Sequence, residues 1–242
     1  MFYFRDVIIF WINCSSNQKR YNHIEKLLEK YFPGNERHHV EAVMHRPKYQ
    51  GVTMAHTLAL MKGLTSNNPF IILEDDVDVA IENLDIKLLE KFVNGMNGLD
   101  ALYLGISGWG NYKNRKVIGS ILDKGERVIR VDDKLFFYKG AKGEWYDDDF
   151  FKIRDMYGAH AILYLNKEYV LKTLKICIYA VDQNRPHDIY LPKILRKGCV
   201  YGLCKSIFYQ LARIGGQERA TKIYLRGVRE INYNKKYENI IE

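Results

Sequence analysis

Three acidic residues follow directly on an apolar run in the first third of the chain. The run, residues 70–73, has the length and composition of a strand buried on both faces, and Glu74, Asp75 and Asp76 come next. Side chains just beyond the C-terminal end of such a strand lie in the crevice where open α/β sheets bind ligands. Adjacent carboxylates repel one another unless they are neutralised, so the cluster predicts a Mg²⁺ or Mn²⁺ site that would also hold a diphosphate. A solvated acidic turn is the competing interpretation.

The acid cluster needs elements that carry it to one edge of a sheet. Residues 7–12 form an apolar run that predicts a buried first strand, and a polar loop begins at Asn13. Apolar side chains at three-to-four-residue spacing predict a helix over residues 21–31. Thr53 is a candidate N-cap for a second helix that ends at about residue 64. The loops that follow the two strands should therefore leave the same edge of the sheet.

The second half of the chain has a more mixed pattern. The predicted elements are helices over residues 84–93 and 167–180, strands over 101–104 and 160–165, and a hairpin over 118–131. Strands and helices alternate first, and the hairpin then interrupts the alternation. We predict one α/β domain with a mostly parallel, partly mixed central sheet and a Rossmann-like N-terminal half.

Composition limits the partners without choosing among them. The chain has 242 residues, of which 47% are hydrophobic and 27% charged, and a net charge of +8 that implies an anionic partner. That partner could be a nucleotide diphosphate, a nucleic acid, a phosphorylated glycan or a membrane face. No stretch approaches the roughly 20 apolar residues of a transmembrane helix, and the start does not resemble a signal peptide. The four scattered cysteines favour a reducing compartment. We expect a cytoplasmic protein, with peripheral attachment to a membrane left open.

The residues around the acid cluster form a longer pattern. It runs Gly51-Val-Thr-Met-Ala-His56, then Leu60, then Asn68-Pro-Phe-Ile-Ile-Leu-Glu-Asp-Asp-Val77. This pattern resembles the family 25 glycosyltransferases, which include lipooligosaccharide galactosyltransferases and collagen hydroxylysine galactosyltransferases. Their signature is a Gly, a Ser-His pair, a helix, and a strand ending in Leu-Glu-Asp-Asp. This chain has Ala55 where the family usually has Ser, so a hydroxyl role there is lost or carried elsewhere.

Weaker matches to the same family follow in the right order and extend the resemblance over about residues 7 to 210. They are Asn13 and Arg20 at the start of the nucleotide-binding half, the strand from Asp100 to Gly105, the glycine-bearing strand from Tyr157 to Leu163, Pro186-His187-Asp188, and a last motif ending in Gln210.

The resemblance implies a GT-A fold, a UDP-sugar donor and usually inversion at the anomeric carbon. By this analogy Asp76 is the principal metal ligand, with Asp75 near the donor ribose or sugar and Glu74 in support. His187 is a further candidate ligand, because GT-A enzymes often recruit a late histidine to the metal and neutral imidazole can bind manganese. The other candidates for donor binding come from the matched motifs: Asn13, Arg20, Gly51 and His56. A buried structural histidine is the competing interpretation for His56.

An inverting transfer also needs a general base near the acceptor hydroxyl, and Asp188 is our candidate. Asp188 precedes the apolar Ile189 and Leu191, so an N-cap at the start of a helix is an equal alternative. The acids at positions 147–149, beside Trp145 and Tyr146, are a rival base site or a solvated loop. Trp109 and Tyr146 could stack on a sugar, although core packing explains most aromatic residues.

We therefore expect a metal-dependent hexosyltransferase that moves galactose or glucose from a UDP-sugar to a glycan or protein hydroxyl. Within the single domain 1–242, residues 1–105 would form the nucleotide-sugar-binding half, 106–215 the acceptor half, and 216–242 a C-terminal extension.

A metal-dependent phosphoryl- or nucleotidyl-transfer enzyme is the first alternative, but residues 101–104 lack the further acids it would need. A basic nucleic-acid-binding module is the second, and residues 193–236 contain no recognised motif for it, so we expect no nucleic-acid partner. A family member that has lost activity is the third.

Overall fold

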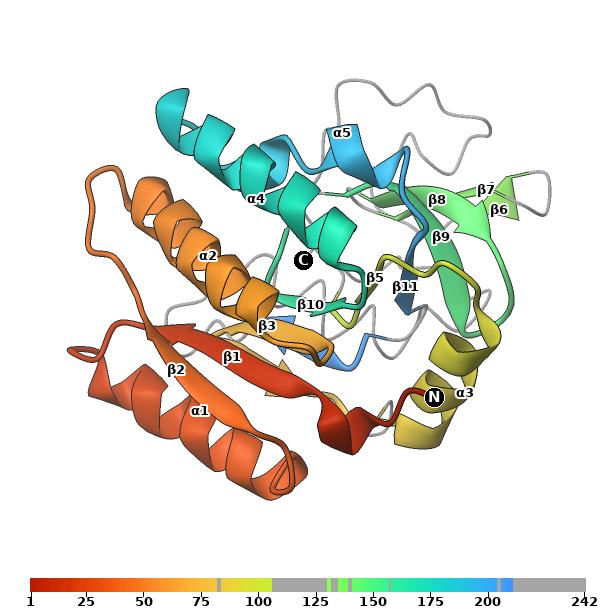
Figure 1. Ribbon diagram of the computed structural model, residues 1–242, viewed down its shortest axis with the longest axis horizontal. Coiled ribbons are helices and arrows are strands. Elements are labelled where there is room, and N and C mark those ends of the chain that lie inside the picture. Colours follow the sequence, from red (N-terminus) through yellow and green to blue (C-terminus); the bar gives the residue numbers. More distant parts are fainter. Residues whose placement is uncertain are drawn as a thin grey trace, which may run out of the picture.

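The structure is a computed structural model that describes residues 1–81, 84–105, 130–131, 135–138, 141–156, 158–203 and 206–210. These residues form a mixed sheet with helices packed on both faces (Figure 1). The helices are α1 (Gln18–Tyr31), α2 (Lys48–Thr65), α3 (Ile86–Gly95), α4 (Lys167–Asp182) and α5 (Pro192–Leu195), with 3-10 turns η1 (Phe4–Asp6) and η5 (His187–Ile189). The strands are β1 (Ile8–Asn13), β2 (Arg37–Glu41), β3 (Phe70–Glu74), β4 (Val77–Val79), β5 (Ala101–Tyr103), β6 (Arg130–Val131), β7 (Leu135–Tyr138), β8 (Ala141–Trp145), β9 (Phe150–Asp155), β10 (Ala161–Tyr164), β11 (Val200–Leu203) and β12 (Phe208–Gln210).

The main sheet has the strand order β2-β1-β3-β10-β5-β11-β9-β8-β7-β6. From β2 to β11 every strand runs in the same direction except β10, which is antiparallel to both of its neighbours. The strands from β9 to β6 extend this sheet as antiparallel pairs. The predicted α/β domain with a mostly parallel, partly mixed sheet is confirmed. Because β10 comes from the second half and lies between β3 and β5, both halves share one sheet.

The apolar run of β1 explains the layered core. Successive side chains of a strand point to opposite faces, so Phe10 and Ile12 join one hydrophobic cluster while Ile9 and Trp11 join the other. The first cluster includes residues of α2 and α4, and the second includes residues of α1 and α3. The sheet is thus buried on both faces, as the continuous apolar run predicts.

Helix α2 begins earlier than the sequence predicts, and Thr53 is not its N-cap. The helix starts at Lys48 after Pro47, and the Thr53 hydroxyl donates a hydrogen bond to the Tyr49 carbonyl oxygen at 2.9 Å, inside the helix. The first turn contains the buried polar Gln50, whose side-chain amide donates to the Val181 carbonyl and the Asn184 side chain. Gln50 is polar but buried, with its side-chain amide satisfied by hydrogen bonds, so it interrupts the apolar periodicity. The sequence pattern therefore does not predict this turn.

The remaining predicted elements in the described residues agree with β1, α1, β3, α3, β5, β10 and α4 to within a few residues. Strand β2 was not predicted, because its Arg-His-His-Val-Glu sequence is mostly exposed at the sheet edge and lacks the apolar signal of a strand. Of the predicted hairpin only residues 130–131 are described, and Trp109 and the extension 216–242 lie outside the described residues. In the described part of the chain, no helix is both long and apolar enough to cross a bilayer.

Candidate active site

The acid cluster lies where β1 and β3 end side by side. The two strands are parallel neighbours, with Ile12 opposite Glu74 in their register, so the polar residues that follow them meet at one edge of the sheet. Asp75 and Asp76 are buried, whereas the Glu74 side chain keeps 24% of its surface exposed. Buried acids at the carboxyl edge of parallel strands occupy the usual ligand-binding position of an α/β sheet.

Two residues of the β1–α1 segment hold Asp75. The Asn13 side-chain amide donates a hydrogen bond to Asp75 at 2.6 Å, and an Arg20 Nη1 atom donates to the other carboxylate oxygen at 2.6 Å. The second terminal nitrogen of Arg20 lies 3.4 Å from an oxygen of Asp76. Arg20 reaches them from the first turn of α1, where the Asn17 side chain accepts a hydrogen bond from its backbone amide. Asn13, Arg20, Asp75 and Asp76 therefore form one bonded group.

Gln210 completes the cluster, and it was not among the predicted site residues. Strand β12 pairs antiparallel with β4, with Gln210 opposite Val77. This pairing lets the Gln210 amide nitrogen donate to Glu74 at 3.2 Å and to Asp76 at 3.3 Å. The sequence signal was the matched motif ending in Gln, but three residues of strand give no indication of their partner.

Burial controls the charge of this cluster. It raises the pKa of Glu74 to about 7, with the neighbouring Asp75 carboxylate raising it further, and the Arg20 guanidinium opposes both effects. Burial, followed by repulsion from Glu74, likewise raises the pKa of Asp76 to about 7. Three carboxylates thus face the guanidinium of Arg20, with the Lys48 ammonium as a further positive charge near Glu74, and an added cation would favour the ionised forms.

The donor chemistry fits a divalent metal, but the arrangement is not a ready-made metal site. Carboxylate oxygens are the ligands that Mg²⁺ and Mn²⁺ prefer. Among the residues that the structure describes, no three His, Cys, Asp or Glu side chains are grouped so that they could hold a metal ion. One oxygen each of Glu74 and Asp76 faces the Gln210 amide. A cation bound by both carboxylates would need this amide to turn or move aside.

Two buried histidines lie next to the acid cluster. His56, on the inner face of α2, places Nε2 3.2 Å from a Glu74 oxygen, and its ring packs against that of His187 with centroids 4.6 Å apart. His187 Nδ1 lies 3.3 Å from the Thr53 hydroxyl, whereas its Nε2 is buried and has no hydrogen-bond partner in the described residues. Burial lowers the pKa of His56 to about 4 and that of His187 to about 3. Both imidazoles are therefore neutral near pH 7, the form that can bind a metal.

Asp188 lies in the 3-10 turn η5, where it caps no helix. The N-cap positions of η5 and α5 are Pro186 and Leu191, so the capping interpretation of Asp188 is wrong. Its Oδ1 atom is buried without a hydrogen-bond partner among the described residues. Burial raises the pKa of Asp188, and Glu74 raises it further, whereas His187 and two backbone amides lower it. A carboxylate kept basic by burial has the property that a general base needs.

The Tyr103 hydroxyl belongs to the same buried region, and sequence reasoning did not identify it. Tyr103 lies on β5, and its hydroxyl also has no hydrogen-bond partner in the described part of the chain. Burial and then the charge of Asp188 raise the pKa of Tyr103. Buried polar atoms without partners are uncommon in folded proteins, so Tyr103, His187 and Asp188 identify a place where a polar ligand could be bound.

Two other predicted positions have structural explanations. A Cβ atom at Gly51 would collide with the Val43 carbonyl oxygen, so glycine there lets α2 pack closely against the preceding segment. The rival base Asp147 accepts hydrogen bonds from the backbone amides of Asp149 and Phe150 at 2.9 and 2.7 Å, as in an ordinary polar turn. Tyr146 is half exposed and packs edge-on against the Phe92 ring.

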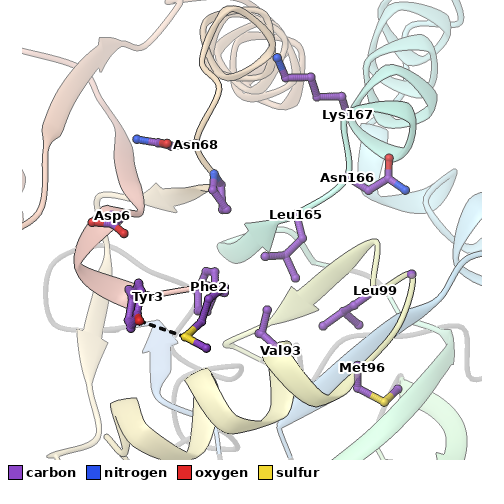
Figure 2. Close-up of a pocket in the computed structure, with 13 residues that line it drawn as sticks. Phe2, Tyr3, Asp6, Asn68, Val93, Met96, Leu99, Leu165, Asn166 and Lys167 are labelled. Atoms are coloured by element: carbon purple, nitrogen blue, oxygen red, sulfur yellow. Dashed lines mark hydrogen bonds between the residues drawn. The ribbon is translucent and has the colours of Figure 1, made fainter.

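A separate pocket lies at the opposite edge of the sheet, where β1, β3 and β5 begin (Figure 2). It encloses about 550 Å³ between the N-terminal segment, α3 and the start of α4. Its lining mixes apolar residues, among them Phe2, Val93 and Leu165, with the polar Asn166 and Lys167. None of the predicted site residues lines this pocket.

Comparison with solved structures gives distant likenesses. No protein-family model matches the chain, and no curated protein matches its sequence. The chain is similar to a glycosyltransferase involved in the glycosylation of the major capsid of PBCV-1, with 10% identity and a TM-score of 0.43, covering 93% of this chain and 98% of that one. It is also similar to the CTP:phosphocholine cytidylyltransferase of Streptococcus pneumoniae, with 12% identity and a TM-score of 0.38, covering 94% and 78%. Likenesses at these TM-scores do not identify a function.

Proposed function

We propose that this protein is a glycosyltransferase of the GT-A type that transfers a hexose from a UDP-sugar to a hydroxyl group of a glycan or protein. The proposal depends mainly on one observation: two partly buried acidic groups lie close enough to affect each other's charge but make separate contacts. Glu74 and Asp76 form the first group and Asp188 forms the second, and Glu74 is among the charges that raise the pKa of Asp188. Transfer of a sugar from a nucleotide needs both a diphosphate site and a base.

We place the donor at the ends of β1 and β3. The nucleotide would lie between the loop that contains Asn13 and Arg20 and the acid cluster, and Mn²⁺ or Mg²⁺ would be held by Asp76 with support from Glu74. When bound, the metal would act as a Lewis acid on the departing diphosphate. Arg20 already bonds two of the three acids. Its guanidinium could turn to the phosphate oxygens when a cation takes over the carboxylates, since Arg pairs well with phosphate.

Asp188 would take the proton of the acceptor hydroxyl as that oxygen attacks the anomeric carbon. The bond from the sugar to the diphosphate oxygen breaks at the same time, and UDP leaves. The Tyr103 hydroxyl and His187 Nε2, which have no partners in the described residues, are suitable for hydrogen bonds to the sugar or the acceptor. His187 would be a metal ligand only if it approached the acid cluster more closely than it does beside His56.

A thermal-shift experiment tests this proposal without knowledge of the acceptor. UDP-galactose and UDP-glucose, each with Mn²⁺, should raise the melting temperature, because a ligand that binds only the folded state stabilises it. At a concentration about a hundredfold above Kd the gain is about 2.7 kcal/mol, or roughly 5 to 10 °C for a chain of this size. The Asp76→Asn variant should show no metal-dependent shift. Equal shifts with Mn²⁺ and with a chelator, or a shift with CTP but none with a UDP-sugar, would argue against the proposal.

A further inference from the structure

The outer faces of α2 and α4 expose more large apolar side chains than any other pair of described helices. The two helices pack side by side on one face of the sheet (Figure 1). Leu58 and Met61 of α2, and Leu171, Ile178 and Tyr179 of α4, are each between 43% and 56% exposed. On α4 these residues recur at the spacing of one helical face, because Leu171 and Ile178 are two turns apart. We call these five residues the α2–α4 apolar face.

Lysines accompany this apolar face. Lys62 on α2, and Lys167, Lys172 and Lys175 on α4, are exposed, whereas the exposed acids of the two segments 58–65 and 167–182 are Glu168 and Asp182. Glu168 is already paired with Lys172 at 2.8 Å. The Lys193 ammonium lies over the rings of Tyr179 and Tyr190, at 5.1 and 4.7 Å from their centroids, and adds a further positive charge at the C-terminal end of the face.

The combination selects one kind of partner. Helices that lie on a membrane expose apolar and aromatic side chains next to lysines, which contact the acyl boundary and the anionic headgroups respectively. A soluble anionic partner would be attracted by the lysines but would leave the apolar residues in contact with water. Single exposed apolar side chains are ordinary, but five of them gathered on two adjacent helices form the kind of patch that marks an interaction or membrane surface.

We infer that the α2–α4 apolar face docks onto an anionic lipid surface. This inference does not depend on the proposed function. It has a consequence for the site, however, since α2 contributes His56 and α4 leads into η5 with Asp188. Docking would therefore hold the candidate active site close to the membrane.

Co-sedimentation with vesicles tests the inference. The complete chain should bind vesicles of phosphatidylcholine with about 30% phosphatidylglycerol much more tightly than vesicles of phosphatidylcholine alone. The pair Leu171→Gln with Ile178→Gln should weaken binding about tenfold or more through lost apolar contact. The pair Lys62→Gln with Lys175→Gln should weaken it by a similar factor, because each charge near an anionic leaflet contributes about fivefold.

A matched pair on the other face of the sheet is the control. Lys26→Gln on α1 with Lys91→Gln on α3 removes the same charge from exposed positions. This pair should change binding less than threefold, because charges on the other face of the sheet lie far from the lipid surface and are screened by salt. The inference is wrong if anionic vesicles are not bound, if the control pair weakens binding as much as the test pairs, or if the apolar pair has no effect. It is also wrong if vesicles are not bound and sedimentation shows that the natural chain self-associates whereas the variant Leu171→Gln with Ile178→Gln does not. The face would then bind a second copy of the chain.

Discussion

At the level of single residues, burial of the candidate metal ligand Asp76 makes the stability of the fold depend on pH. Its carboxylate is buried beside Glu74, and burial raises its pKa from an ordinary value to about 7. A raised pKa means that the folded protein binds this proton more tightly than the unfolded chain does. The contribution of protonated Asp76 to the free energy of unfolding is therefore complete in acid and is lost as the pH rises through about 7.

Replacing Asp76 with Asn should make the metal-free protein more resistant to alkali. Because Asn cannot ionise, the free energy of unfolding of Asp76→Asn, relative to the natural chain, should increase by about 1 to 3 kcal/mol between about pH 5 and pH 8.5. Glu74 shares the cost of ionising the buried acid cluster. The change in the free energy of unfolding should therefore be smaller than a shift of about three pKa units at Asp76 alone would give. Urea unfolding in the presence of a chelator measures it, and Glu29→Gln on the exposed face of α1 is the control. If Asp76→Asn and the natural chain differed in free energy of unfolding by the same amount at both pH values, the pKa of Asp76 would not be raised in the folded protein.

Asp188 can be tested separately from the fold. Asp188→Asn keeps the size of the side chain and can still accept hydrogen bonds from the local backbone amides. The melting temperature should therefore stay nearly unchanged, while sugar transfer should fall about a hundredfold to ten-thousandfold if Asp188 is the base. Asp147→Asn removes the rival acid, whose carboxylate only accepts turn hydrogen bonds, and should leave transfer unaffected. If Asp147→Asn abolished transfer and Asp188→Asn did not, the assignment of the base would be reversed.

At the scale of elements, the start of α2 is where sequence reasoning was least accurate. Apolar periodicity predicted the body of the helix, but the first turn consists of Lys48, Tyr49 and the hydrogen-bonded Gln50, which have no apolar pattern. The resemblance placed Gly51 on the donor side, whereas the structure explains it by close packing against Val43. A glycine can be needed for a ligand or for a neighbouring backbone, and a sequence alone does not separate the two.

The packing role of Gly51 makes a direct prediction for stability. Gly51→Ala would push a methyl group into the Val43 carbonyl oxygen, and should lower the free energy of unfolding by about 1 to 3 kcal/mol. Gly95→Ala, at the last residue of α3, is the matched control, since a Cβ atom at this position would have no other atom within 4 Å. That change should be neutral or stabilise by up to about 1 kcal/mol, because alanine restricts the unfolded chain. If both variants had equal stability, Gly51 would not be explained by packing.

At the scale of the whole molecule, the site is assembled from segments that are far apart in the chain. Asn13 and Glu74 come from β1 and β3, whose ends meet at one edge of the main sheet, and Gln210 joins them from β12, which pairs with β4 in a separate two-stranded sheet. The apolar runs predicted β1 and β3, and the rule for parallel strands predicted that their ends would meet. Strand β12 and the edge strand β2 could not be predicted in this way, because three residues or an exposed polar strand carry no periodic signal.

The same long-range pairing explains which site residues were found. Arg20, Asp75 and Asp76 were predicted and form one bonded group: Asp75 and Asp76 follow directly on β3, and Arg20 lies in the first turn of the helix after β1. Gln210 and Tyr103 were missed as site residues because the role of Gln210 depends on the pairing of β12 with β4, and that of Tyr103 on β5 holding its hydroxyl near Asp188. His187 was predicted as a metal ligand, but its contacts are with Thr53 and the His56 ring, and this role stays a prediction.

The central claim is that the acid cluster supports sugar transfer from a nucleotide, and the products formed from UDP-galactose or UDP-glucose with Mn²⁺ test it most directly. Mass spectrometry of the reaction should detect free UDP with released or transferred hexose, and Asp76→Asn should reduce the release of UDP at least about a hundredfold. Formation of UMP and a sugar phosphate, release of pyrophosphate from a nucleoside triphosphate, or UDP release that is unchanged in Asp76→Asn would contradict the account.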